Sequence, residues 1–137
     1  MVCTFFGHRD APQWVREKLK IVITDLAENK GVKLFYVGNQ GSFDYMVRQV
    51  LEELKLKYYI VLAYMPSKMN EFDTTDYSYT IYPEGLESSP PKFAIDKRNR
   101  WMIEKSDYVV CFVTRSFGGA TKFRYMDIKK GKTVIDL

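Results

Sequence analysis

Short apolar runs alternate with segments of helical period along most of this chain. Five runs have the length and composition of buried β-strands: VCTFF (2–6), KLFYV (33–37), KYYIVLAYM (57–65), YVVCFV (108–113) and KTVIDL (132–137). Between them, apolar residues recur three and four positions apart, which predicts amphipathic helices over 12–30, 44–54, 92–107 and 121–130. Asp10 is placed to cap the first helix, and Gly31 to end it.

This alternation predicts a single α/β domain over 1–137, built as a Rossmann-like fold of three layers. Since crossovers between parallel strands are right-handed, the simplest arrangement is a mainly parallel five-stranded sheet in the order 3-2-1-4-5. Ligands of such sheets bind beyond the carboxyl ends of the strands, where the winding reverses. That point corresponds to GHRD (7–10) and TRSFGGAT (114–121), with GNQGSF (38–43) alongside.

Helical and strand periodicity both fail over residues 66–91, which are rich in turn formers and tyrosines. The segment is longer than the usual connections in compact domains. Two interpretations remain open, namely a lid over a ligand site and a surface insertion that contacts no ligand.

Composition narrows the class of protein. Hydrophobic residues make up 46% and charged residues 28% of the 137, which favours a globular chain over a disordered one. The apolar runs are shorter than the roughly 20 residues of a membrane span, and the N-terminus lacks the pattern of a signal peptide. We therefore expect a cytoplasmic protein that does not bind a membrane.

The cysteines and the net charge narrow the kinds of metal and ligand that the chain is expected to bind. Cys3 and Cys111 lie in apolar runs and are expected to be small buried hydrophobes. Together with one histidine they do not form a zinc pattern, so we predict no metal. A formal charge of +4, from 21 basic and 17 acidic residues spread along the chain, fits a small anionic ligand as well as nucleic acid.

Two glycine-containing loops are candidate anion sites. Gly118 and Gly119, before the helix predicted from Thr121, allow backbone N–H groups to approach an anion, although the pair also suits a plain tight loop. Arg9 follows Gly7 and either forks onto a phosphate or pairs with a neighbouring acid, Asp10 or Asp44. His8, the only histidine, is expected to be structural, because no nucleophile lies near it in the sequence.

Further candidates lie on the predicted helices. Arg98, Asn99 and Arg100 point about 100° apart on one helix, so at most two of them face one ligand. Asn99 shares an apolar stripe with Met102 and is expected to face inward, while Arg98 and Arg100 either contact the ligand or are solvated or paired.

Two residues before the second helix have two interpretations each. Ser42 is placed to cap this helix and bind an anion there, and Phe43 to stack on a base. The alternative is that Ser42 acts only as a cap and Phe43 only packs in the core.

The stretches FFGHRD, YVGNQGSFD, DKRNRWMIEKSDYVVCFV and GGATKFRYMDIKKGKTVIDL follow one another over nearly the whole chain. In this combination the chain resembles the SLOG superfamily, the Rossmann-like domains that include the DprA and LOG proteins, and within it the small YpsA-like branch. The resemblance implies a pocket for a nucleotide or nucleotide-derived ligand. Its matching positions are Gly7, His8, Arg9, Gly38, Arg98 to Arg100, Gly118, Gly119 and Thr121.

The chain differs from the enzymes of this group at the position of their catalytic glutamate. LOG phosphoribohydrolases carry a motif that resembles Gly-Gly-x-Gly-Thr, followed closely by a catalytic Glu. Here one residue is missing, Ala120 replaces the third glycine, and the acidic position falls on Phe123 or Arg124. Nucleoside deoxyribosyltransferases, which end similarly, place their Glu at the position of Arg124. A guanidinium cannot stabilise an oxocarbenium-like sugar, but it favours a bound phosphate.

Two function classes follow from these observations. The first, which we favour, is non-catalytic binding of a nucleotide-like anion by a sensor or sequestering module without a further cofactor, acting through a protein partner or self-association. The second is an enzyme that cleaves or exchanges the N-glycosidic bond of nucleoside monophosphates, with its acid supplied by Asp127 or by the 66–91 segment. Nucleic-acid binding of the DprA kind would require a basic stripe with stacking aromatic residues; the charge is dispersed, but the tyrosine-rich 66–91 segment keeps this third interpretation open.

Overall fold

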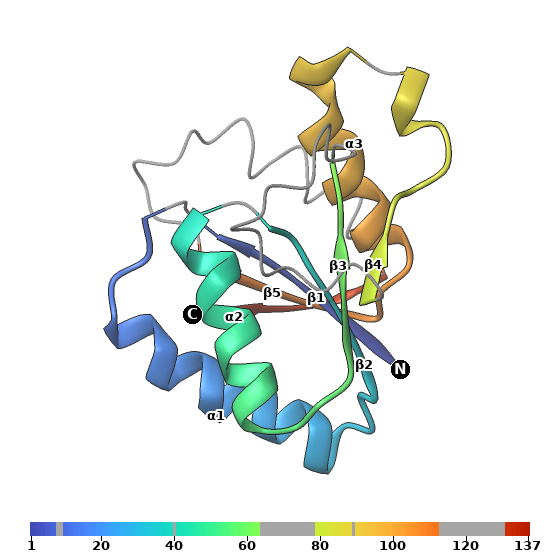
Figure 1. Cartoon of the computed structure of the whole chain (residues 1–137). Helices are drawn as coiled ribbons and strands as arrows, with labels where there is room; N and C mark the ends of the chain where they lie inside the picture. The colour runs from blue at the N-terminus through green and yellow to red at the C-terminus, as the bar shows by residue number, and fades with distance from the viewer. Residues whose placement is uncertain (8–9, 40, 64–78, 89, 113–130) are drawn as a thin grey trace.

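A parallel sheet of six strands runs through the part of the chain that the computed structural model describes, residues 1–7, 10–39, 41–63, 79–88, 90–112 and 131–137 (Figure 1). The sheet order is β4-β3-β2-β1-β5-β6, and every neighbouring pair is parallel. The strands are β1 (Val2–Gly7), β2 (Leu34–Val37), β3 (Tyr58–Val61), β4 (Thr80–Ile81), β5 (Tyr108–Phe112) and β6 (Thr133–Asp136).

The five predicted strands lie in the predicted order, but the predicted strand count is wrong. The sixth strand, β4, falls inside the 66–91 segment, where Thr80 and Ile81 pair with Ile60 and Val61 of β3. The N–H of Leu62 also donates to the carbonyl of Ile81 at 2.8 Å. Two residues are too few to show a period-two pattern, which is why the sequence did not reveal this strand.

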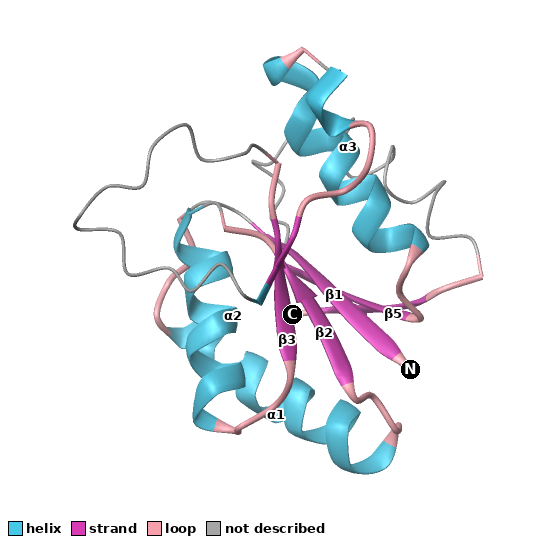
Figure 2. Cartoon of the chain, turned by 45° about the vertical axis from the view of Figure 1, so that its right-hand side comes forward, coloured by secondary structure: helices cyan, strands magenta, loops and turns pink. Residues whose placement is uncertain are grey.

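Helices cover both faces of the sheet, which gives the three predicted layers (Figure 2). The helices α1 (Trp14–Asn29) and α2 (Gly41–Glu53) lie on one face, and α3 (Pro91–Glu104), which follows the short 3-10 helix η2 (Leu86–Ser88), lies on the other. The helix predicted over 121–130 lies outside the described residues. Within the described ranges, every helix is too short or too polar to cross a bilayer.

The helix starts differ from the prediction, whereas the end of α1 agrees with it. Helix α1 begins at Trp14, and its N-cap is Gln13 without a side-chain hydrogen bond, so Asp10 is not the cap. Gly31, with φ of +72°, follows the C-cap of α1, a place that favours glycine. Helix α2 begins three residues before the predicted Asp44, at Gly41, which has φ of +84°.

The core is divided by the sheet into two clusters. The larger one packs α1 and α2 against the sheet and includes Phe5 and Phe35, whose ring centroids lie 6.0 Å apart. The smaller one packs α3 against Phe6 and its neighbours on β3 and β5. Each fully buried Leu, Ile, Val or Phe side chain contributes about 1.5–3 kcal/mol to stability.

The two cysteines are buried and free, as predicted. Cys3 belongs to the cluster under α1 and α2, and Cys111 to the cluster under α3. Successive strand residues face opposite sides of a sheet, so these thiols lie on opposite faces. Burial, and secondarily the proximity of Cys111, raises the pKa of the Cys3 thiol well above its ordinary value.

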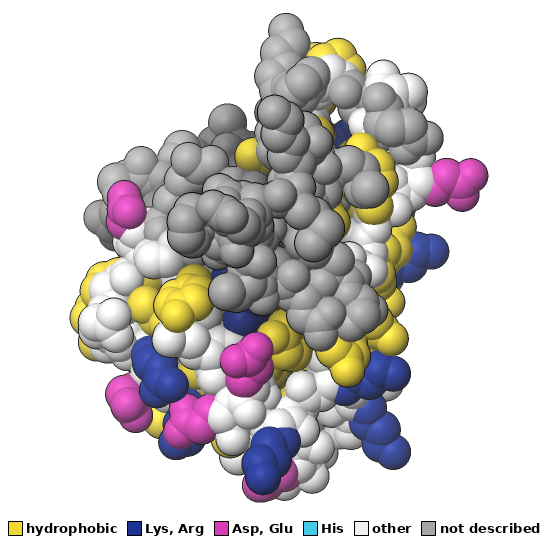
Figure 3. Space-filling model, viewed as in Figure 1, with side chains coloured by type: hydrophobic (Ala, Val, Ile, Leu, Met, Phe, Trp, Pro, Cys, Tyr) yellow, Lys and Arg dark blue, Asp and Glu magenta, His cyan; other side chains and the backbone are white. Residues whose placement is uncertain are grey.

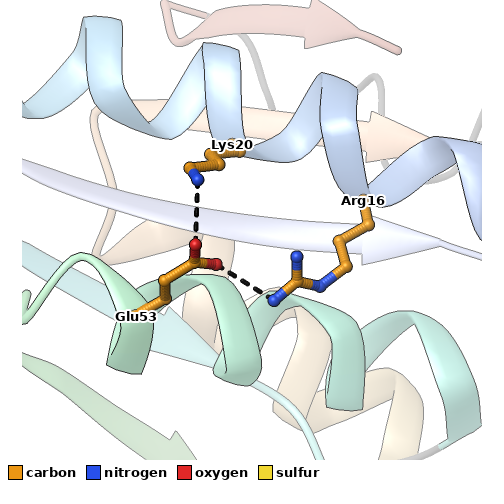
Figure 4. A network of polar contacts seen from close by, with 3 residues as sticks. All are labelled: Arg16, Lys20 and Glu53. Carbon is orange, nitrogen blue, oxygen red and sulfur yellow. Dashed lines mark hydrogen bonds and ion pairs between the residues drawn. The ribbon is translucent and has the colours of Figure 1, made fainter.

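A surface ion network joins α1 to α2 (Figure 4). The carboxylate of Glu53 accepts from Nζ of Lys20 at 2.8 Å and from Nη2 of Arg16 at 3.0 Å. The hydrogen bond from Lys20 is the main reason that the pKa of Glu53 is lowered. Exposed pairs of this kind add little to stability, so the buried faces are the main contact between these helices.

Candidate functional site

The carboxyl ends of β1, β2 and β5 form the centre of the candidate site. Strand β1 pairs with β2 on one side and with β5 on the other, and Gly7 is paired with Phe112 at the last step. The chain winds outward from β1 through β2 and β3, then returns to add β5 and β6 on the other side. The winding therefore reverses between β1 and β5, which is where open parallel sheets bind their ligands.

Gly7 ends β1 directly against the ring of Phe43. A Cβ built on Gly7 would overlap ring atoms of Phe43, so this position requires glycine because of the close approach. The ring of Phe43 is fully buried and stacks on Phe112, with centroids 6.2 Å apart and an interplanar angle of 23°. This geometry favours core packing of Phe43 over stacking on a base.

Ser42 ties the loop between β1 and α1 to the start of α2. Its Oγ accepts a hydrogen bond from the backbone N–H of Ala11 at 2.8 Å. Ser42 is the second residue of α2 and does not precede the helix, so the predicted role as its cap is wrong. The bond instead fixes residues just after β1 next to the buried Phe43.

Gly38, one residue beyond the end of β2, is enclosed by two charged side chains. A Cβ built there would lie 2.6 Å from Oδ2 of Asp44 and 2.9 Å from Nη1 of Arg98. Asp44 extends from α2 on one face of the sheet, and Arg98 from α3 on the other. Both are buried, with exposed fractions of 8% and 3%. A carboxylate and a guanidinium from opposite layers thus both lie against the backbone of Gly38 at one strand end.

The guanidinium of Arg98 connects neighbouring strand ends. Nη1 donates to the carbonyl of Val61 at the end of β3 at 3.2 Å, and Nε donates to Oδ1 of Asn99 at 2.9 Å. With Gly38 beside it, Arg98 reaches the ends of both β2 and β3.

Arg98 is the more deeply buried residue of this part of α3, while Asn99, which was predicted to face inward, is half-buried and accepts a hydrogen bond from Arg98. Arg98 lies one turn from the buried Ala94 and Met102, and this i±4 spacing is the signal that the sequence offered for it.

Arg100 does not join Arg98 at the strand ends. Its side chain is 45% exposed, and Nε donates to Oδ2 of Asp96 at 3.0 Å, one turn earlier on the same helix. This is one of the alternatives that the sequence left open. Two positions along a helix correspond to about 200° of rotation, so Arg100 and Arg98 point to nearly opposite sides of α3.

Trp14 and Asp44 are site residues that the sequence did not single out as ligand contacts. Trp14, the first residue of α1, is 52% exposed and makes an edge-to-face contact with Phe112 at 5.6 Å. Nζ of Lys18 lies 5.0 Å from the centroid of its indole ring. For Trp14, the sequence signal for a ligand contact was an aromatic residue in the first turn of an amphipathic helix. For Asp44, the sequence indicated only a helix start or an ion pair with Arg9.

The remaining predicted site residues lie outside the described residues. They are His8, Arg9, Gly118, Gly119, Ala120, Thr121 and Arg124. Most of the 66–91 segment also falls there, so its role as lid or insertion stays a prediction. Among the described residues, no three His, Cys, Asp or Glu side chains are placed to hold a metal ion.

Comparison with known proteins adds no relative, since neither a family model nor a curated protein sequence matches this chain. The site is therefore defined by its geometry. It combines two glycines at the ends of adjacent parallel strands, a buried carboxylate and guanidinium at one of them, and an exposed indole nearby. Such an edge suits a ligand with a charged group and a flat apolar part.

Proposed function

We propose that this protein binds a nucleotide or nucleotide-derived anion at the carboxyl ends of β1, β2 and β5, and that it does so without turning the ligand over. The proposal includes membership of the SLOG superfamily, on the sequence resemblance described above. In this function the protein senses or sequesters its ligand and passes the signal on through a protein partner or a second copy.

The observation that supports this function best is the burial of Arg98 and Asp44 at Gly38. Removing two charges from water costs several kcal/mol each, and apolar residues of similar size often stabilise a fold as well or better. Buried charged groups occur at functional sites and also in structural ion pairs, and their position at the end of a parallel strand, where open sheets bind ligands, favours a functional site. A guanidinium there also provides positive potential for a phosphate.

Arg98 acts mainly as a positioning residue in this proposal, because only 3% of it is exposed. It holds the carbonyl end of β3 and the amide of Asn99, which is half-buried at the same edge. Trp14 supplies an exposed indole on the neighbouring side, against Phe112. Stacking of a base on such a ring contributes about 1–3 kcal/mol.

The charge distribution supports a small ligand over nucleic acid. On the lower left of the face seen in Figure 3, described basic and acidic side chains are interspersed, whereas a polynucleotide surface gathers Lys and Arg in a stripe. The salt dependence of binding tests this point, because a polynucleotide that contacts several phosphates loses orders of magnitude in affinity as salt rises.

A second candidate function is favoured by Asp44. From the sequence alone, the catalytic acid of an enzyme acting on N-glycosidic bonds is expected in the 66–91 segment or at Asp127. In the structure, Asp44 is a buried carboxylate at the strand ends. A carboxylate can stabilise or trap the sugar cation that forms when an N-glycosidic bond breaks. The alternative is thus a small enzyme acting on nucleoside monophosphates, with Asp44 as its acid.

Mass spectrometry of small molecules released from the purified protein tests the binding directly, followed by calorimetric titration with a panel of nucleoside monophosphates and with any nucleotide found. We expect Arg98→Lys to lower affinity about tenfold, because Lys keeps the charge but loses the forked donors. Arg100→Lys is the matched control and should bind as the unmodified protein does. If no nucleotide is released and none binds on titration, the proposal fails.

The enzyme is distinguished by incubating the protein with a panel of nucleoside monophosphates and measuring free base by chromatography. We expect none. Release of base that disappears in Asp44→Asn would establish the alternative function and overturn the non-catalytic one.

A further inference from the structure

Strand β6 lies at one edge of the sheet, with β5 as its only neighbour among the described strands. Its residues are more exposed than those of the inner strands, and Val134 in its centre is 38% exposed. The opposite edge is β4, which has only two residues. Very short edge strands are a common protection against pairing between chains. Strand β6, with four residues, is twice as long as β4.

The hydrogen bonds of β6 show which of its backbone groups face outward. The N–H groups of Thr133 and Leu137 donate to Asp107 and Cys111, at 3.1 and 2.9 Å. In a parallel strand, alternate residues bond to the same neighbour, so Thr133, Ile135 and Leu137 face β5. The N–H and C=O groups of Lys132, Val134 and Asp136 therefore point away from the sheet.

These outward groups match a second copy of the same strand in antiparallel orientation. With Val134 opposite Val134 across a twofold axis, Lys132 of each copy lies opposite Asp136 of the other. All three outward residues then form hydrogen-bonded pairs with outward residues, and both cross-strand charge pairs are attractive. We propose that β6 pairs with β6 of a second copy, so that the two sheets become one continuous sheet.

Other registers are less favourable. A shift by two residues sets Lys132 opposite Val134 and removes both charge pairs. A shift by one residue sets outward backbone groups opposite inward ones and breaks the ladder. Parallel pairing needs an offset of one residue, because in a parallel ladder a residue that faces its neighbour lies opposite one that faces away, as Thr133 lies opposite Tyr108. That offset places Lys132 opposite Thr133 and forms no attractive charge pair. The charges on this edge thus select the twofold antiparallel pair, whose interface is closed.

Sedimentation velocity over a range of protein concentrations tests the pairing. We expect the mass of two chains, and we expect Val134→Pro to give the mass of one. Proline removes the outward N–H of Val134, which no bond within the sheet uses, so the thermal unfolding midpoint should change little. A single-chain mass at every concentration, or a dimer that survives Val134→Pro in a folded protein, would overturn the proposal.

Charge reversal separates this register from any other dimer. Lys132→Asp alone and Asp136→Lys alone should each raise the dissociation constant about tenfold, because two attractive pairs become repulsive. The double variant should restore it. Lys33→Asp, at an exposed position on a loop before β2, is the matched control for net charge. Since Nζ of Lys132 also donates to the carbonyl of Glu104 at 3.4 Å, unfolding is measured for each variant. Failure of the double variant to restore the dimer contradicts the register.

A disulfide gives an independent distance test. Opposite residues of a hydrogen-bonded pair have Cα atoms about 5.5 Å apart, within the range that a disulfide spans. Val134→Cys should therefore link two copies on mild oxidation, while the native thiols stay buried. Ile21→Cys, on an exposed part of α1, is the control and should link much more slowly. Equal rates for the two variants would count against the proposed contact.

Discussion

Asp44 and Arg98 approach the backbone of Gly38 from opposite faces of the sheet, at the end of β2. Both the α2 layer and the α3 layer thus place a charged group at this strand end, whereas most of the buried side chains among the described residues are apolar. Burying a carboxylate and a guanidinium costs free energy unless each group has good hydrogen-bond or ion-pair partners. Removing the partners of either group should therefore lower the stability of the fold.

The two arginines of α3 should therefore differ sharply in their effect on stability. Arg98→Ala is expected to lower the free energy of unfolding by about 1–3 kcal/mol, because it leaves the buried Val61 carbonyl without the guanidinium that donates to it. Arg100→Ala removes an exposed pair with Asp96 and should change it by less than about 0.5 kcal/mol. Urea unfolding measures both, and equal effects would show that the burial of Arg98 has no energetic consequence.

Two glycines at the strand ends should differ as well. Gly7→Ala places a methyl group against the ring of Phe43, which is fully buried and stacked on Phe112. Gly38→Ala meets the ends of two longer side chains, which yield more easily. We expect Gly38→Ala to cost about 1–3 kcal/mol of unfolding free energy and Gly7→Ala more.

The double variant Gly7→Ala with Phe43→Leu tests the cause. If the steric contact with the ring is responsible, the smaller side chain should recover part of the loss from Gly7→Ala, and the two changes should be non-additive. If the losses of unfolding free energy from the two substitutions are additive, the contact between the added methyl group and the ring of Phe43 is not the cause of the destabilisation.

How much of the fold and of the candidate site could be predicted from the sequence depends on whether a residue's structural role leaves a pattern in the neighbouring sequence. The strand order followed from apolar runs such as 108–113, since buried strands require them and right-handed crossovers then leave few topologies. Arg98 was not recognised as buried, because patterns of hydrophobicity place arginine on the surface unless a partner is known. Its partners are a carbonyl and a glycine far away in the sequence, Val61 and Gly38, and no local pattern encodes such contacts. Strand β4 was not predicted for a different reason, namely that it has only two residues.

The surface network of Glu53 should be visible as a shifted titration. Because the hydrogen bond from Lys20 is the largest cause of its lowered pKa, Lys20→Met should raise that pKa toward the ordinary value more than Arg16→Met does. A depressed pKa means that any stabilisation is present above the ordinary value of 4.5 and is lost as pH falls through the folded pKa. NMR titration of the side chain measures the order, and a larger effect of Arg16→Met would contradict it.

The last prediction concerns high pH and the buried thiol of Cys3. Burial raises its pKa well above 9.0, so above that pH the folded chain keeps a proton that the unfolded chain releases. The free energy of unfolding should therefore be independent of this group below about pH 8.5 and fall by up to about 1.4 kcal/mol per pH unit above it. Tyrosines and lysines titrate in the same range, so the test compares unfolding curves of the unmodified protein and Cys3→Ala from pH 8 upward. Cys3→Ala should be less stable at neutral pH because of the cavity it leaves, yet lose stability less steeply as pH rises. Parallel curves would mean that the thiol does not ionise on unfolding in this range.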